Sequence, residues 1–212
     1  MNAEKARIRT TIRASRFARV HRDAHAQDEQ RGSGSINSLP LRPPSMLLAH
    51  WLTTVEALGA ATPALPALFV PTRTEPDVRP ILAAYDECLL PVVADNVGRP
   101  LPEPAWALWH RGEELVDPSG RGPSQPGGLR LTASGLARAD IILVPALAVD
   151  LRGNRLGQGG GWYDRALRHA RPRAPLIAVV FDDEVSSQTL PTQAHDRSVD
   201  AVITPSGYHV FR

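Results

Sequence analysis

Apolar residues fall into short runs along this 212-residue chain, separated by polar stretches rich in glycine and proline. Several runs are apolar at consecutive positions and lack the polar–apolar alternation of a strand with one exposed face. Continuous apolar runs of this length are typical of parallel strands that are buried on both faces. Six runs are predicted as strands: 64–70, 88–94, 105–109, 141–146, 176–181 and 199–204.

Other segments repeat their apolar residues every three or four positions, which is the period of an amphipathic helix. The clearest of them is 45–58, which two prolines precede and Gly59 follows, as is usual at helix ends. Further helices are predicted at 4–23, around 77–87 and over about 161–170. Helices that alternate with buried strands predict an α/β fold, with a mainly parallel central sheet in a three-layer α/β/α arrangement.

The first predicted helix carries Lys5, Arg9, Arg13 and Arg16 at steps of four, four and three, so that these residues share one face. Such a face is either ordinary solvated surface or the wall of a site for an anionic ligand. Lys5 is the only lysine in the chain. Both interpretations of this basic face are left open.

Two polar stretches, 24–40 and 117–130, interrupt these patterns and are predicted to be flexible loops. Neither is long enough to suggest a boundary between two cores, and no internal repeat is visible. We therefore expect residues 1–212 to form a single domain.

Charge and composition exclude several classes of protein. The 24 basic and 22 acidic residues leave a net charge of only +2, so no nucleic-acid partner is expected. No run approaches the ~20 apolar residues that cross a membrane, and the N-terminal residues lack a signal-peptide core. The single cysteine, Cys88, lies in an apolar run and is predicted to be buried. The chain is expected to be a cytoplasmic monomer without a membrane partner.

The stretch GNRLGQGGGWYDR (153–165) follows the buried run at 141–146 and holds four glycines within five residues. It does not match the dinucleotide-binding pattern, because Trp162 stands where the third glycine is needed. It also lacks the Gly-Lys-Ser/Thr of a Walker loop. Glycines without side chains allow backbone N–H groups, and those of a following helix, to approach an anion. The alternative is a tight turn, which needs fewer glycines.

Asp164 follows this loop directly, although an anion site should disfavour a carboxylate. It either complements the dipole of a helix that begins here, or it holds Mg²⁺ between itself and phosphate oxygens. Arg155 and Arg165 flank the loop and could neutralise further negative charge.

The segment VPALAVDLRGNRLGQGGGWYDRAL (144–167) resembles the signature of the 5-formyltetrahydrofolate cyclo-ligases, also called 5,10-methenyltetrahydrofolate synthetases. Three weaker similarities follow in the family's order: KARIR (5–9), FVPTRTEPDV (69–78) and HDRSVDAVIT (195–204). Together they span nearly the whole chain. The resemblance implies the conversion of 5-formyltetrahydrofolate to 5,10-methenyltetrahydrofolate, with ATP as co-substrate and Mg²⁺ as cofactor. Phosphorylation of the formyl oxygen would let it leave as phosphate after N10 attacks the same carbon.

The resemblance also implies site residues. For ATP it implies Lys5 and Arg9 together with Arg155, Leu156, Gly157, Gln158, Gly159, Gly160, Gly161, Trp162 and Tyr163. For the folate it implies Val70 and Glu75 together with Gln158, Gly159, Gly160, Gly161 and Trp162. Arg155 and Asp164 would be catalytic, and Asp164 and Asp196 would bind the metal. From the residues alone, Val70 could equally be a core residue, Glu75 a helix-entry residue and Asp196 a turn residue.

The sequence departs from the family pattern at Gln158, often aromatic or basic in the family, and at Gly160, where some members carry lysine. Trp162 replaces a common tyrosine, and residues 122–128 and 75–78 also differ. These departures leave a second function open, a non-catalytic protein of the same fold that binds folate or nucleotide.

Overall fold

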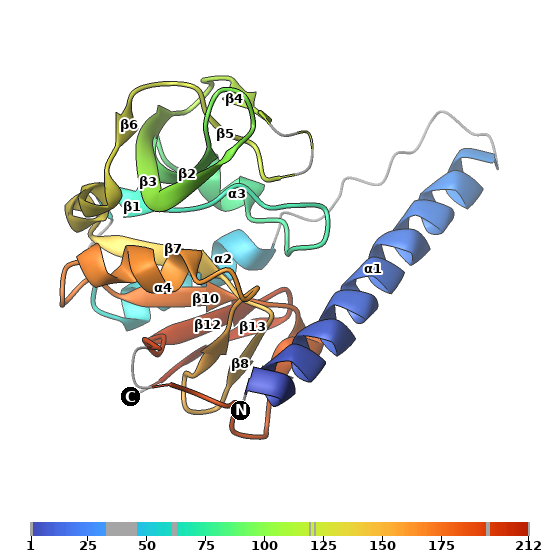
Figure 1. Cartoon of the computed structure of the whole chain (residues 1–212). Coiled ribbons are helices and arrows are strands. Elements are labelled where there is room, and N and C mark those ends of the chain that lie inside the picture. The colour runs from blue at the N-terminus through green and yellow to red at the C-terminus, as the bar shows by residue number, and fades with distance from the viewer. Residues whose placement is uncertain are drawn as a thin grey trace.

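An eight-stranded sheet runs through the middle of the molecule (Figure 1). The computed structural model describes residues 2–32, 46–60, 63–118, 120, 122–193 and 196–211. The strand order is β13-β12-β10-β7-β1-β2-β3-β6. The strands of this sheet are β1 (Pro66–Ala67), β2 (Glu87–Ala94), β3 (Pro100–His110), β6 (Arg130–Leu131), β7 (Ile141–Pro145), β10 (Leu176–Val179), β12 (Ala201–Thr204) and β13 (Gly207–Val210).

The middle of the sheet is parallel. Strands β12, β10, β7, β1 and β2 pair with their neighbours in parallel, whereas β13 at one edge and β3 and β6 at the other pair antiparallel. Each central strand is buried on both faces, as a parallel sheet covered by helices requires. The mainly parallel sheet predicted from the apolar runs is confirmed.

Helices cover both faces of the sheet. Helix α2 (Met46–Ala57) and the short α3 (Arg79–Leu82) lie on one face, and Ile141 and Leu143 of β7 pack in the same cluster. On the other face, Ile142 and Val144 pack with Leu136, Ala166 and Leu167. The elements of that face are η1 (Ala133–Arg138), α4 (Trp162–Ala166) and η2 (Leu167–His169). Consecutive residues of one strand thus serve two cores, which gives the predicted three layers.

Two small sheets were not predicted. The first small sheet consists of β8 (Ala148–Asp150), β9 (Arg155–Leu156) and β11 (Val185–Ser186). The short helix η3 (Asp182–Glu184) directly precedes β11. Strands β4 (Leu115–Val116) and β5 (Gln125–Pro126) form the other. Their two or three residues are too few to show a period in the sequence.

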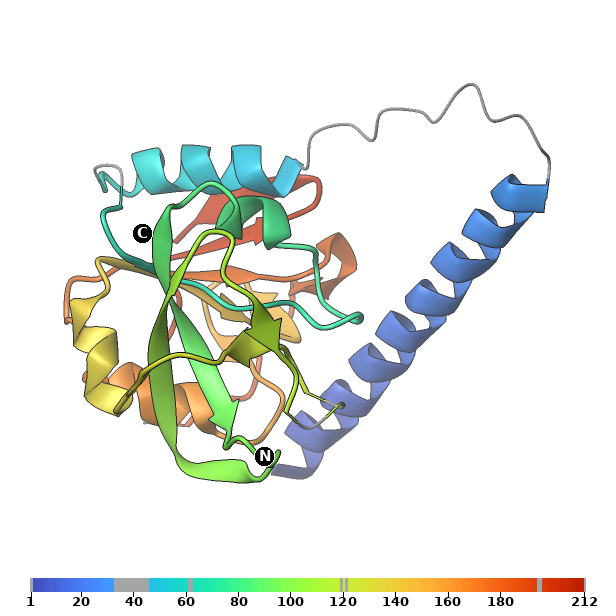
Figure 2. The same cartoon turned by 90° about the horizontal axis from the view of Figure 1, so that it is seen from above.

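The first helix is longer than predicted. Helix α1 spans Asn2–Gly32, so residues 24–32 are helical and were wrongly assigned to a loop, while 33–40 lie outside the described residues. The cause is local: 24–31 contain Ala, Gln, Glu and Arg, which favour helices, and no proline. Figures 1 and 2 show the start of α1 against the body and its later turns projecting away from it.

Other boundaries also differ from the prediction. The helix expected around 77–87 is only Arg79–Leu82, and the strand expected at 64–70 pairs only at Pro66–Ala67. The segment 117–130, predicted as a loop, contains β5 because the buried Gln125 side chain bonds the backbone of Val93 and Ala94. Because this contact is made by a polar side chain, the pattern of apolar residues could not predict it.

Cys88 is fully buried, as predicted, and burial raises the pKa of its thiol to about 12, which leaves it unreactive. None of the helices in the described ranges has the length and hydropathy needed to span a bilayer.

Candidate functional site

A pocket of about 810 Å³ opens at the carboxyl ends of β1 and β7. Phe69 and Val70 follow β1, and Pro145 ends β7. From β1 the chain proceeds to β2 on one side and later returns to β7 on the other, so the strand order reverses between β1 and β7. In open α/β sheets, ligands bind outside the carboxyl ends of the strands at such a reversal.

The residues implied by the sequence resemblance lie around this one pocket. Its lining includes Lys5, Arg9, Val70, Glu75, Arg155, Leu156, Gly157, Gln158, Gly159, Gly160, Gly161, Trp162, Tyr163, Asp164 and Asp196. They come from α1, from the segment after β1, from β9 with its following loop, from the start of α4, and from the segment before β12. Their individual roles remain predictions.

The glycine-rich loop connects β9 to α4 and is held from outside by α1. Arg9 Nε donates to the carbonyl of Gly157 at 2.9 Å, and Arg13 Nε donates to Gln158 Oε1 at 3.1 Å. Gly159 has a φ of +99°, and a Cβ there would lie 3.3 Å from Arg9 Cζ. Within the described part of the chain, the backbone N–H groups from Gln158 to Gly161 donate to no other group. They remain available to an anion, which the anion-site interpretation of the glycine pattern requires.

Two acidic residues on the cationic side are each paired with a base. Lys5, only 7% exposed, places Nζ 2.7 Å from Asp196 Oδ2, which also accepts from the Gln193 N–H at 2.8 Å. Arg155 Nη2 donates to Asp164 Oδ1, while the buried Nε of Arg155 has no partner among the described residues. The sequence left two explanations for Asp164, and neither included this ion pair.

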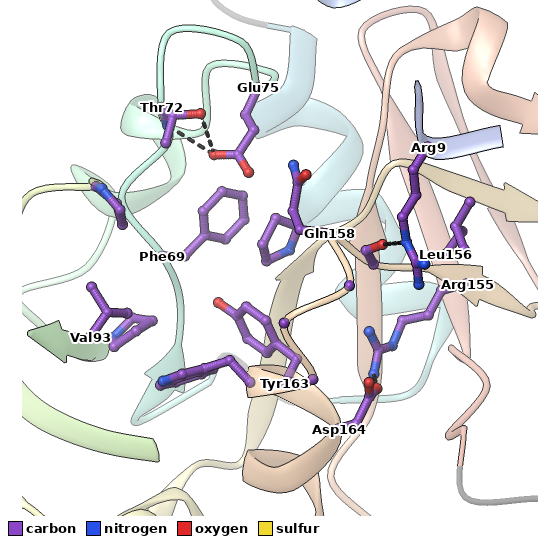
Figure 3. Close-up of a pocket in the computed structure, with 18 of the residues that line it drawn as sticks. Arg9, Phe69, Thr72, Glu75, Val93, Arg155, Leu156, Gln158, Tyr163 and Asp164 are labelled. Atoms are coloured by element: carbon purple, nitrogen blue, oxygen red, sulfur yellow. Dashed lines mark hydrogen bonds and ion pairs between the residues drawn. The ribbon is translucent and has the colours of Figure 1, made fainter. Parts of the chain in front are cut away.

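The opposite side of the pocket carries a carboxylate among aromatic and apolar groups. Glu75 Oε2 accepts from the Thr72 N–H at 2.8 Å and from Thr72 Oγ1 at 3.0 Å, which fixes the carboxylate. Burial raises the pKa of Tyr163, and the charge of Glu75 raises it further, so this phenol stays protonated and can donate. Figure 3 shows Glu75 and Phe69 on one side, Arg9 and Arg155 on the other, and Gln158 between them.

Several further residues that were not predicted line the pocket, namely Phe69, Thr72, Thr74, Pro91, Val93, Pro123, Ser124, Pro145 and Gln193. Most of them lie at strand ends or in loops that meet only in the fold. Thr72 carried a local signal, because a threonine three residues before a glutamate is a pattern in which the two side chains and the backbone bond one another. Apolar Phe69 and Val93 carried none.

Among the described residues, no three His, Cys, Asp or Glu side chains form a group that could hold a metal ion. Mg²⁺ does not require such a group, because it usually binds one or two carboxylates together with substrate phosphates and water. Asp164 suits this mode, since Arg155 engages Oδ1 and the side chain is still 32% exposed. Asp196 is less available, because its Oδ2 already accepts from two donors.

The profile of the 5-formyltetrahydrofolate cyclo-ligase family matches residues 1–205. The chain belongs to this family. The 5-formyltetrahydrofolate cyclo-ligase of Mycolicibacterium smegmatis is 40% identical over 164 residues, which cover 74% of this chain and 80% of that protein. The mouse 5-formyltetrahydrofolate cyclo-ligase is 31% identical over 107 residues, covering 49% of this chain and 46% of its own. The enzyme class expected from the sequence is thereby confirmed.

The fold of this cyclo-ligase family member is also similar to solved structures. The NMR structure of Aquifex aeolicus 5,10-methenyltetrahydrofolate synthetase superposes with a TM-score of 0.66. The match covers 98% of this chain and 93% of that one at 24% identity. At this identity the similarity concerns the arrangement of helices and strands, and it supports the fold class predicted from the sequence.

Proposed function

We propose that this protein catalyses the ATP- and Mg²⁺-dependent cyclisation of 5-formyltetrahydrofolate to 5,10-methenyltetrahydrofolate, with release of ADP and phosphate. The observation that carries the proposal is the two-sided pocket. On one side lie cationic side chains and loop N–H groups that have no acceptor in the described ranges, and on the other lies a fixed carboxylate among apolar groups. This arrangement suits two different ligands that must meet, in a chain that belongs to the cyclo-ligase family.

The cationic side is proposed to bind ATP. Lys5, Arg9 and Arg155 surround the loop from Gly157 to Gly161, and the loop N–H groups and these bases would together bind the phosphate oxygens. The buried Nε of Arg155 has no acceptor among the described residues, which supports its assignment, because a buried donor without an acceptor is costly unless a ligand supplies one. Leu156, Gln158, Trp162 and Tyr163 complete the proposed nucleotide side.

The opposite side is proposed to bind the folate. Glu75 would accept hydrogen bonds from the pterin N–H groups, since an ionised carboxylate accepts only. Val70 and Trp162 would offer apolar contact, and Gln158 and the glycines would face both ligands. The hydroxyl of Tyr163 stays protonated beside Glu75 and could donate to a ligand oxygen.

Mg²⁺ is proposed to bind at Asp164, with phosphate oxygens and water as its other ligands, and it would neutralise charge on the phosphates. Asp196 is retained as a second proposed ligand, although the Lys5 ammonium bound to its Oδ2 would compete with a cation there. In its present pair, Asp196 orients Lys5 toward the pocket.

The chemistry needs no protein nucleophile. The γ-phosphoryl group passes to the formyl oxygen, N10 attacks the formyl carbon, and the oxygen leaves as phosphate. The chain would contribute position and charge: Arg155, with Asp164 beside it, stabilises the transferred phosphoryl group, and the pocket holds N10 near the carbon. Because Gly160 carries no charge, Arg155 is the proposed principal cation for the transfer.

The test is a spectrophotometric assay of the purified protein with 5-formyltetrahydrofolate and MgATP. The near-ultraviolet absorbance of the methenyl product should rise, and the rise should disappear when ATP or Mg²⁺ is omitted. An established family member serves as the positive control. If that enzyme turns over and this protein does not at high concentration, catalysis is contradicted.

The competing function is a non-catalytic protein that binds folate or nucleotide. It is favoured by one observation, that Lys5 and Arg155 are both paired with carboxylates inside the pocket and offer phosphate less net charge than free bases would. Calorimetry that finds tight binding of ATP and folate without ADP release would select it.

A further inference from the structure

Helix α1 contacts the body through a continuous row of basic side chains. Arg9 and Arg13 bind the glycine-rich loop, and Lys5 binds Asp196. Arg16 and Arg19, at two further steps of three, bind Glu184 and Asp183. Among the described residues, α1 adds only Ile8 and Ile12 to the buried apolar clusters, where they pack against Ala148, Leu156 and Leu190. Arg16 and Arg19 also lie over the ring of Phe181. The position of α1 therefore depends mainly on its polar contacts.

The Arg16–Glu184 pair is buried more completely than the Lys5–Asp196 and Arg19–Asp183 pairs. Arg16 is 1% exposed and Glu184 is 5% exposed. Arg16 Nε and Nη2 each lie 2.7 Å from a different carboxylate oxygen of Glu184, a two-bond pairing that fixes direction as well as distance. Arg16 Nη2 also donates to the carbonyl of Ala146 at 2.6 Å. The pair thus links α1 to the residue after β7 and to η3, which follows β10.

The pair lies on the same face of the helix as the proposed ATP-binding residues. Lys5 and Arg16 are eleven residues apart, which is about 16 Å along a helix. Because a helix is stiff over this length, fixing Arg16 against the ends of β7 and β10 fixes where Lys5 and Arg9 can reach. Neither Arg16 nor Glu184 lines the large pocket.

We propose that the buried Arg16–Glu184 pair is a positioning pair, which sets α1 on the carboxyl end of the sheet so that Lys5 and Arg9 reach the nucleotide. The proposal rests on the proposed function for the identity of the ligand, but the anchoring of α1 can be tested without it. Few apolar contacts hold α1, so loss of the pair should release the helix before the central sheet unfolds.

The test compares Glu184→Gln with Asp183→Asn. Both changes remove a charge without changing shape, at neighbouring residues that bind neighbouring arginines of α1. Asp183 is 57% exposed, and an exposed ion pair contributes little, so its variant is the matched control. In Glu184→Gln, we expect the apparent KM for ATP to rise about 10- to 100-fold, the KM for the folate to change far less, and the control to match wild type.

Hydrogen exchange supplies the readout that does not depend on activity. Backbone amides of residues 5–20 should exchange faster in Glu184→Gln, while those of β7 and β10 keep their wild-type protection. Arg16→Lys, which keeps the charge but loses the two-bond geometry, should give an intermediate KM for ATP and guards against a variant that fails to fold. A uniform fall in protection across the molecule, or equal rises in both KM values, would reduce the pair to a contributor to stability.

The two proposals fail in different ways. A wild-type protein without ATP-dependent turnover contradicts the proposed function, and the exchange comparison then still decides whether the pair anchors α1. An active wild type whose Glu184→Gln variant keeps both a protected α1 and an unchanged KM for ATP overturns the positioning pair alone.

Discussion

At the scale of single residues, two cationic side chains of the pocket are already paired with carboxylates, so a bound anion would compete with these carboxylates for them. Asp164 is bonded to Arg155 at the pocket wall, and its side chain is 32% exposed. Its partner Arg155 is only 4% exposed, so the carboxylate neutralises a buried guanidinium and contributes to folding as well as to the charge of the pocket. We propose that Asp164 has a functional role in addition to this structural one.

Asp164→Asn tests this assignment. Turnover with MgATP should fall about 100-fold or more, because the charge proposed to hold Mg²⁺ and orient Arg155 is lost. Stability should fall far less, because the asparagine oxygen can still accept from Arg155. Steady-state kinetics and thermal unfolding measure the two effects. Asp86→Asn is the control, since Asp86 pairs with Arg111 but is 87% exposed and lies outside the pocket. Equal losses of turnover and stability in Asp164→Asn would make the carboxylate structural.

Gly159 and Gly160 are adjacent but predict opposite responses to alanine. Gly159 has a φ of +99°, and an added Cβ would approach Arg9, whereas a Cβ on Gly160 meets nothing within 4 Å. Gly159→Ala should lower the free energy of unfolding by about 1–2 kcal/mol because of backbone strain. Gly160→Ala should leave it unchanged or raise it slightly, by limiting the unfolded chain. Denaturant titrations of both variants measure this, and equal effects would contradict the loop geometry.

At the scale of elements, α1 is the part of the chain that completes the pocket from outside the sheet. Lys5→Ala should raise the apparent KM for ATP while leaving the KM for the folate near its wild-type value, because Lys5 lies on the cationic side. Arg22→Ala, an exposed residue further along the same helix, is the matched control. An unchanged KM for ATP in Lys5→Ala would return this face of α1 to ordinary surface.

The sequence predicted those elements whose own residues form a clear apolar run or a helical period. Strands β7, β10 and β12 are uninterrupted apolar runs, and α2 presents apolar residues at helical spacing. Strands β8, β9 and β11 escaped prediction because two or three residues show no period, although β9 carries Arg155. The end of α1 was missed because a polar composition was taken for a loop.

The site was predictable to the extent that its residues are adjacent in the chain or match a family motif. The pairings between them were not. Lys5 and Asp196 are 191 positions apart, so only the fold brings them together. Arg155 and Asp164 are nine apart, yet their contact depends on the turn between β9 and α4. Glu184, now proposed to position α1, has no neighbour in sequence that signals its burial.

At the scale of the whole molecule, the buried carboxylate of Asp150 makes the stability of the fold depend on pH. Asp150 is 1% exposed and accepts four hydrogen bonds, from the backbone N–H groups of Arg152, Asn154 and Leu190 and from Asn154 Nδ2. Burial alone would raise the pKa of Asp150, but these hydrogen bonds outweigh it and hold the pKa below its ordinary value. They also fix the turn that leads into β9.

A depressed pKa in the folded state stabilises the protein above the unfolded value of about 3.9, and this contribution is lost as the pH falls through the folded value. Asp150→Asn should therefore cost about 1–3 kcal/mol at neutral pH. The difference from wild type should shrink in acid, below about pH 4. Chemical unfolding at several pH values measures it. If the difference in free energy of unfolding between the variant and wild type did not vary with pH, the ionised form of Asp150 would not be the form that stabilises the fold.

Lys5 makes the occupancy of this pocket chemically readable. Because it is the only lysine, an amine-selective acylating reagent has one side-chain target in the entire chain, and that target lies buried against Asp196. Its labelling rate, followed by mass spectrometry, therefore reports a single location without any engineered reporter. A nucleotide that covers Lys5 would slow the reaction, and release of α1 would accelerate it. The acylation rate of Lys5 could thus report both ligand binding and movement of α1 in the unmodified protein.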